Sequence, residues 1–327
     1  MGSIPLSILD LSPVLEGHDA AHSYRESVET AQLAERLGYK RYWFAEHHNI
    51  ASVASSATSI LIGHIAGATK TIRVGAGGIM LPNHAPLMIA EQFGTLESLY
   101  PGRIDLGLGR AAGGGQATAR ALRRTMMGGE DRFPNDVQEL LMYFSGEGRE
   151  SRVNAVPGEG LGVPIWILGS SLYGAQLAAH FGLPYAFASH FAPAALVDAA
   201  RIYRETFRPS DYLDKPHFMM ASQVVAADTD EEADFQASTV RRRFQHMQMN
   251  VMGLFSPPDP DFEFDPRVRR GVEATLAMSV VGSPQTVKAR LDEMMQALQP
   301  DELIISAPIY DLDKRKRSME IVMEVAG

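Results

Sequence analysis

The chain of 327 residues contains no cysteine. This absence excludes disulfide bonds, thiolate metal ligands and a cysteine nucleophile. The chain also lacks any run of about 18 apolar residues, so no membrane span is expected. Its first residues have neither the basic nor the apolar region of a signal peptide, and we therefore expect a cytoplasmic protein that does not contact a membrane.

Positive charge is in short supply. Lys and Arg number 30 against 39 Asp and Glu, which gives a formal net charge of −9. Proteins that bind nucleic acid need a basic surface to replace the counterions of the phosphates, so this balance argues against a nucleic-acid partner. The one dense basic run, residues 314–317, is expected on a solvated face of a C-terminal helix. A small-molecule ligand is the remaining expectation.

Short apolar runs alternate along the chain with longer helical patterns, which predicts a parallel sheet with helical crossovers. The strands are expected at residues 5–11, 41–45, 71–76, 103–109, 165–168, 185–189, 218–226 and 303–306. Eight strand-plus-helix units favour a closed (β/α)8 barrel, with an open doubly wound sheet as the alternative. We expect one domain over residues 1–327, with insertions at about 111–162 and 250–270.

Ionisable residues follow the second predicted strand as Glu46, His47 and His48. The carboxyl ends of barrel strands converge on the face where the catalytic sites of this fold lie. Neighbouring side chains on a strand point to opposite faces, so His47 and His48 are poorly placed to share one ion and no metal is expected. Because histidine titrates near neutral pH, His47 suits proton transfer. The alternative is a hydrogen-bonded structural role for Glu46 and His47.

An anion site is predicted where the fourth and fifth strands end. Arg110 follows one strand, and Gly169, Ser170 and Ser171 lie between the other strand and a helix. A guanidinium can hold a phosphate through two parallel hydrogen bonds, and the N–H groups at a helix N-terminus attract anions. Taken singly, Arg110 is also compatible with a surface position, and the serines with a helix cap.

Glycines end the third predicted strand at residues 75, 77 and 78. Gly77 and Gly78 either form a tight turn or let the backbone lie flat against a planar ligand.

Several separated motifs at these strand ends resemble those of the bacterial luciferase-like monooxygenases. They are residues 42–48, 73–84, 101–110, 164–171, 181–184 and 281–284. The resemblance implies a barrel with FMN lying across its C-terminal face. It assigns the phosphate to Arg110, Gly169, Ser170 and Ser171 with the backbone of Leu172 and Tyr173. It assigns the isoalloxazine to the Gly77–Gly78 peptide, which is often cis in the family, and catalysis to Glu46 and His47. We expect Met80 and Gln116 to line the substrate pocket.

The chemistry implied by the resemblance is the oxygenation of a small apolar substrate. Reduced FMN, supplied by a separate flavin reductase, reacts with O2, and His47 transfers a proton. The resemblance also implies a homodimer, and residues 257–265 are expected to act as a lid. Light-emitting members carry a reactive cysteine just before the phosphate arginine, where this chain has Gly109, which argues against light emission.

Other functions remain open on the sequence. The first is F420-dependent hydride transfer on the same scaffold, and the second is a flavin-binding protein without turnover. A metal-dependent barrel hydrolase is disfavoured by the ligand spacing.

Overall fold

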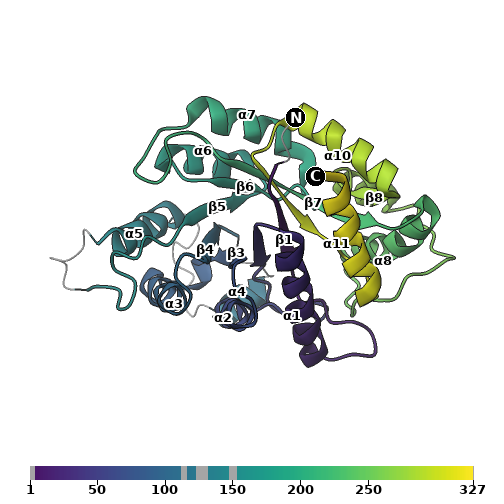
Figure 1. Cartoon of the computed structure of the whole chain (residues 1–327), viewed down its shortest axis with the longest axis horizontal. Helices are drawn as coiled ribbons and strands as arrows, with labels where there is room; N and C mark the ends of the chain where they lie inside the picture. The colour runs from purple at the N-terminus through teal and green to yellow at the C-terminus, as the bar shows by residue number, and fades with distance from the viewer. Residues whose placement is uncertain (1–3, 112–115, 123–131, 147–152, 327) are drawn as a thin grey trace.

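A computed structural model describes residues 4–111, 116–122, 132–146 and 153–326. Its strands form one ring of eight parallel strands with helices around it (Figure 1). The ring closes because β1 pairs with β9 through Leu6 and Leu303, and β6 pairs with β7 through Tyr185 and Phe218. The predicted (β/α)8 barrel is therefore confirmed.

The strands are β1 (Leu6–Asp10), β2 (Arg41–Phe44), β3 (Arg73–Met80), β4 (Ile104–Gly109), β5 (Ile165–Gly169), β6 (Tyr185–Phe187), β7 (Phe218–Ala226), β8 (Val280–Gly282) and β9 (Glu302–Ser306). The α-helices are α1 (Ala20–Leu37), α2 (Thr58–Ala68), α3 (Pro86–Leu99), α4 (Gln116–Leu122), α5 (Phe133–Ser145), α6 (Leu172–Phe181), α7 (Leu196–Thr206), α8 (Asp230–Gln248), α9 (Arg269–Thr275), α10 (Pro284–Leu298) and α11 (Leu312–Ala326). In Figure 1, α1, α2 and α3 lie on one side of the barrel and α6, α7 and α10 on the other.

Strand β8 is absent from the sequence prediction. It pairs with the second half of β7, where Val224 meets Val280, and is not part of the closed ring. β7 has nine residues, so it extends past its neighbours and leaves backbone groups for a further strand. Its three residues hold only two apolar side chains, Val280 and Val281, which is too short a run to reveal a strand, whereas all three residues of β6 are apolar.

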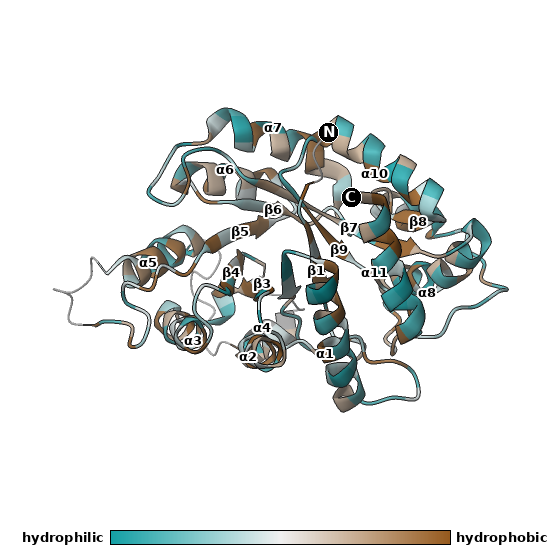
Figure 2. Cartoon of the chain, in the orientation of Figure 1, coloured by the Kyte–Doolittle hydropathy of each residue, from teal (hydrophilic) through white to brown (hydrophobic). Residues whose placement is uncertain are grey.

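Hydrophobic side chains fill two layers. The larger lies between the strands and the helices, and Figure 2 shows the matching pattern of apolar strands and hydrophilic outer helix faces. The smaller lies inside the ring, where the rings of Trp43 and Trp166 pack edge to face with centroids 5.2 Å apart. The inward positions nearer the C-terminal ends of the strands, such as Ala45, Ala186 and Ala221, are small. The interior is therefore filled at one end and hollow at the other.

Buried ion pairs occupy the N-terminal end of the barrel. Arg41 lies 2.7 Å from Asp105 and 2.6 Å from Glu302, and Asp105 also binds Arg73 at 2.6 Å. Trp43 donates its indole N–H to Asp105 at 3.1 Å. These contacts tie β2, β3, β4 and β9 together at the end opposite the cavity.

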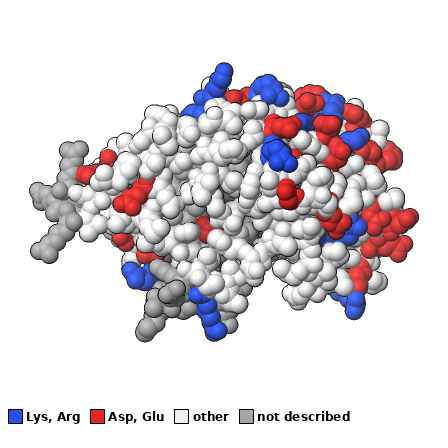
Figure 3. All heavy atoms as spheres, turned by 90° about the horizontal axis from the view of Figure 1, so that it is seen from below, with Lys and Arg blue, Asp and Glu red and all other residues white. Residues whose placement is uncertain are grey.

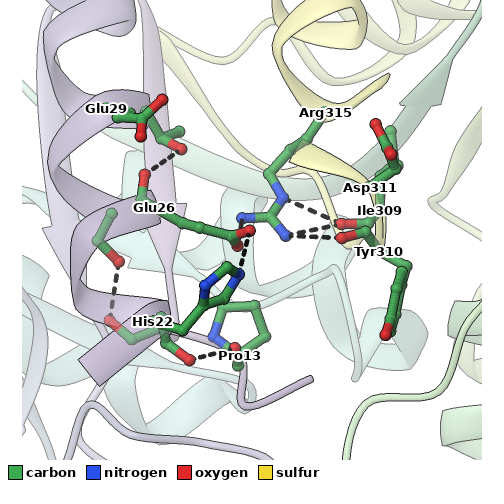
Figure 4. A network of polar contacts seen from close by, with 12 residues as sticks. Pro13, His22, Glu26, Glu29, Ile309, Tyr310, Asp311 and Arg315 are labelled. Atoms are coloured by element: carbon green, nitrogen blue, oxygen red, sulfur yellow. Dashed lines mark hydrogen bonds and ion pairs between the residues drawn. The ribbon is translucent and has the colours of Figure 1, made fainter. Parts of the chain in front are cut away.

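A second buried pair joins the first and last helices. Arg315 of α11 lies 3.2 Å from Glu26 of α1 and donates to the carbonyl of Ile309, as Figure 4 shows. His22 shares the Glu26 carboxylate at 3.0 Å. The pair fixes the loop after β9 against the N-terminal helix. No described helix is long and apolar enough to cross a membrane.

Candidate active site

A cavity of about 210 Å³ opens at the C-terminal end of the barrel. Its walls are mostly apolar, with few polar groups among them, as is typical of ligand sites. The side chains and glycines named in the sequence analysis that line it are His47, Gly77, Gly78, Met80, Arg110, Gly169, Ser170, Ser171 and Tyr173. The structure thus brings together residues from the ends of four strands.

The glycines of β3 let two strands approach closely. A Cβ atom on Gly78 would lie 2.6 Å from the carbonyl oxygen of Gly107, a distance that no side chain tolerates. A Cβ atom on Gly77 would lie 3.0 Å from Leu9 and from Trp43. The Gly77–Gly78 peptide is cis, and the pairing with β4 shifts register at this point. Bare backbone therefore forms this wall of the cavity.

Arg110 has a free guanidinium in the part of the chain that the structure describes. It makes neither a hydrogen bond nor an ion pair there, and its Cζ atom lies 4.2 Å from the centroid of the Tyr173 ring. Stacking on an aromatic face holds the guanidinium in place while its N–H groups stay available.

Ser171 precedes α6 in extended conformation, with φ −143 and ψ 168, but its side chain makes no capping hydrogen bond. The first N–H groups of this helix therefore keep their capacity to bind an anion. Tyr185 holds the turn by donating to the Ser171 carbonyl at 3.2 Å. Leu172 does not line the cavity, and its side chain is exposed.

Glu46 lies behind the cavity wall and does not line it. It accepts hydrogen bonds from the Met80 N–H at 2.9 Å and from His48 and His84 at 2.8 and 3.0 Å. Burial alone would raise the pKa of this carboxyl, but the hydrogen bond and charge of His84, with His48 and Met80, lower it. The carboxylate thus fixes the end of β3 next to the loop that carries His47.

Two histidines face the cavity. His47 was expected there, whereas His190, which follows β6, was not assigned a role. Burial, together with the nearby charges of His47 and Arg243, lowers the pKa of His190 to about 3, so this ring is neutral at physiological pH. Its position directly after the predicted strand of residues 185–189 is the signal that the sequence offers.

The sequence also predicts Gln116 as a pocket residue and residues 257–265 as a lid. Gln116 begins α4, and its side chain lies outside the described residues. Residues 257–265 pack against α8, where Arg242 contacts the Pro257 carbonyl and lies 3.4 Å from Asp259. His84, which binds Glu46, lay within a motif named above but without a role.

The chain is similar in sequence to a known family of enzymes. A family model described as luciferase-like monooxygenase matches residues 4–302. The chain belongs to this family. It is 51% identical to the Bacillus subtilis protein YvbT over 98% of this chain and 96% of that one. It is 46% identical to an Escherichia coli luciferase-like monooxygenase, over 99% and 97%. The N-acetyl-S-alkylcysteine monooxygenase of Bacillus subtilis is 37% identical over 71% and 70%.

Solved structures agree with this assignment. Apo-MsnO8 superposes with a TM-score of 0.88 at 35% identity, covering 98% of each chain. The oxygenating constituent of 3,6-diketocamphane monooxygenase from Pseudomonas putida, solved with FMN, shares the fold at a TM-score of 0.72 and 19% identity, covering 99% and 98%.

Proposed function

We propose that this luciferase-like monooxygenase uses reduced FMN and O2 to oxygenate a small organic substrate. The observation that carries the proposal is the unpaired guanidinium of Arg110 beside the uncapped start of α6, at the edge of a largely apolar cavity. Such a pair of groups favours a phosphate, and the cavity beside it favours an apolar ring system.

The residues present fit FMN. Arg110, Ser170, Ser171 and the first backbone N–H groups of α6 would hold its phosphate, and the Gly77–Gly78 backbone leaves room for a flat ring. When bound, the reduced cofactor supplies the reaction with O2 that delivers one oxygen atom to the substrate. A separate flavin reductase would provide it in reduced form.

The side chains of this chain would then position the reactants and move a proton. His47 faces the cavity and is the candidate for proton transfer, while Glu46 holds the end of β3 behind the cavity wall by accepting from the Met80 N–H. His190 stays neutral, so it can exchange a hydrogen bond without adding charge. Apolar walls such as Leu9, Phe187 and Ile304 exclude water.

F420 is the second candidate cofactor, because an F420-dependent secondary alcohol dehydrogenase shares the fold at a TM-score of 0.71, with 15% identity and 99% coverage of this chain. At that identity the likeness concerns the fold alone. FMN is favoured because the E. coli and N-acetyl-S-alkylcysteine relatives are named monooxygenases. The net charge of −9 also disfavours the polyglutamate tail of F420.

We also propose a homodimer. Exposed apolar side chains gather on α2 and α3, with Ile60 71%, Met88 55% and Leu99 63% exposed. Figure 3, which views the molecule from the side of α1, α2 and α3, shows a broad face with few charged residues. A second copy of the chain would cover this face.

The cofactor assignment is tested by titrating FMN into the wild type and Arg110→Ala while following flavin fluorescence. The variant should bind FMN at least about tenfold more weakly, because a charge-assisted pair is lost. Arg201→Ala, on the exposed surface of α7, is the matched control and should bind as the wild type does. Equal binding by Arg110→Ala would refute the phosphate site.

The reaction is tested with a flavin reductase, O2 and a panel of organic substrates. His47→Ala should bind FMN but lose oxygenated product. If His47→Ala forms product at the wild-type level, His47 has a structural role. If the protein instead reduces a substrate with F420 in the absence of O2, hydride transfer replaces the proposed reaction.

A further inference from the structure

A second unpaired guanidinium lies close to the cavity. Arg243 of α8 has no hydrogen bond and no ion pair among the residues that the structure describes. Its Cζ atom lies 5.8 Å from the centroid of the Phe255 ring, and Phe255 itself is buried. Burial lowers the pKa of Arg243 to about 10, so the group remains charged at neutral pH without an ion-pair partner in this part of the chain.

The side chain is directed towards the barrel. Val240 and Phe244, one turn before and one residue after Arg243, are buried against the core. Arg243 lines a small recess that shares Leu9 and Leu11 with the large cavity. The recess therefore adjoins the site proposed for the flavin and substrate.

Neighbouring charged groups in the recess make no ion pair with Arg243. Asp10 lines it too, but its oxygens accept from the Ser12 N–H, the Ser27 hydroxyl and the Tyr42 hydroxyl. Arg315 pairs with Glu26. Arg243 is therefore the group in this recess with hydrogen-bonding capacity to spare.

Two further buried polar atoms near the cavity lack partners. The Nδ1 atom of His190 and the Oε1 atom of Gln223 are buried without a hydrogen bond within the described ranges. Gln223, only 4% exposed, donates its amide N–H to the backbone carbonyl of His190 at 2.9 Å, so its side chain lies next to the His190 backbone. His190 lines the large cavity, and the charge of Arg243 contributes to lowering the pKa of its ring.

Arg243 is partly buried, and a bound anion would offset the cost of holding its unpaired charge partly out of water. A planar carboxylate matches the fork of a guanidinium, and the recess, at about 40 Å³, suits a group of that size better than a ring. The carboxylate of Asp10 in the same recess disfavours a doubly charged anion such as phosphate more than a single negative charge.

We propose that Arg243 binds a carboxylate on the substrate, with His190 and Gln223 beside it and the apolar remainder of the substrate lying along Leu9 and Leu11 towards His47. The inference rests on the proposed function, since it concerns the molecule to be oxygenated. It narrows the substrate class to carboxylic acids that carry an apolar group.

The test measures binding of benzoate to full-length protein saturated with FMN, with benzamide as the uncharged probe of the same shape. The wild type should bind benzoate at least about tenfold more tightly than benzamide, as measured by titration calorimetry. Arg243→Met should lose this preference. Arg241→Met, the same substitution on the same helix where the guanidinium pairs with Asp234 at 2.5 Å, should retain it.

Equal binding of benzoate and benzamide by the wild type would overturn the proposal, as would an unchanged preference in Arg243→Met. Tighter binding of phenyl phosphate than of benzoate would overturn the carboxylate assignment. Arg243→Lys keeps the charge and should keep part of the preference, which separates charge from folding. If FMN does not bind, the proposed function fails. The further inference is then tested separately, by measuring benzoate and benzamide binding to flavin-free Arg110→Ala protein, which still decides whether Arg243 selects carboxylates.

Discussion

Glu46 shows how one residue can matter to a cavity that it does not line. Its two oxygens receive the Met80 N–H and the rings of His48 and His84, so it joins β3 to the loop after β2. The sequence placed Glu46 correctly at a strand end. Its partners could not be predicted, because His84 lies 38 residues away and only the closed barrel brings it near.

Replacement of Glu46 should therefore act through stability. In Glu46→Gln the amide keeps the shape of the side chain but replaces one of two accepting oxygens with an N–H group, so one of the present donors loses its acceptor. We expect the free energy of unfolding to fall by about 1–3 kcal/mol, measured by urea denaturation. Glu231→Gln, on the exposed start of α8, is the control and should change little. Equal losses in the two variants would contradict this role.

At the scale of the element, strand ends were predictable and the contacts between elements were not. Alternation of apolar runs located all eight strands of the ring, because each must bury both faces. The sequence marks Gly77 and Gly78 as unusual but does not distinguish a tight turn from a backbone that lies flat against a ligand. The structure shows that Gly78 faces the carbonyl of Gly107 on β4, a contact between residues with no pattern linking them.

A methyl group on Gly78 should force β3 and β4 apart. We expect Gly78→Ala to lose about 1–3 kcal/mol of unfolding free energy and to bind FMN more weakly, since overpacking displaces this wall of the cavity. Thermal denaturation and the fluorescence titration measure the two effects. Gly253→Ala is the matched control, because nothing lies within 4 Å of the added atom. A fully stable Gly78→Ala would show that the strands tolerate the wider spacing.

At the scale of the whole molecule, charged residues are spread unevenly over the face drawn in Figure 3, dense over one part and sparse over the rest. The helices α2 and α3 expose apolar residues on a side with few charged groups, so little charge repulsion opposes contact with another copy of the chain. Composition could not predict this division, since 45% hydrophobic residues is an ordinary value and their grouping depends on the fold.

The proposed dimer should dissociate when charge is added to this face. We expect Ile60→Asp to shift the mass measured by light scattering towards that of one chain. Val197→Asp is the control, because Val197 is 67% exposed but lies on α7, outside the proposed interface. A wild-type protein that is monomeric at all concentrations would contradict the proposal.

Stability of the barrel should also depend on acid. Burial would raise the pKa of Glu302, but His217, Arg41 and Lys40 lower it to about 2. Because this folded-state pKa lies below the ordinary value of 4.5, the carboxylate stabilises the protein above that pH and loses its contribution as pH falls towards 2. The loss should be about 3 kcal/mol. Denaturation at a series of pH values should show a shallower acid dependence for Glu302→Gln than for the wild type.

The ion pairs around Arg41 sit at one end of the barrel, and the hollow with His47 sits at the other. The first residues of the strands thus contribute mainly to the stability of the barrel, and the last residues contribute to the chemistry of the site. Mutational libraries confined to the final positions and the loops beyond them should yield many folded variants with altered substrate preference. Libraries at the opening positions should yield mostly inactive aggregates, whichever substrate is used for selection.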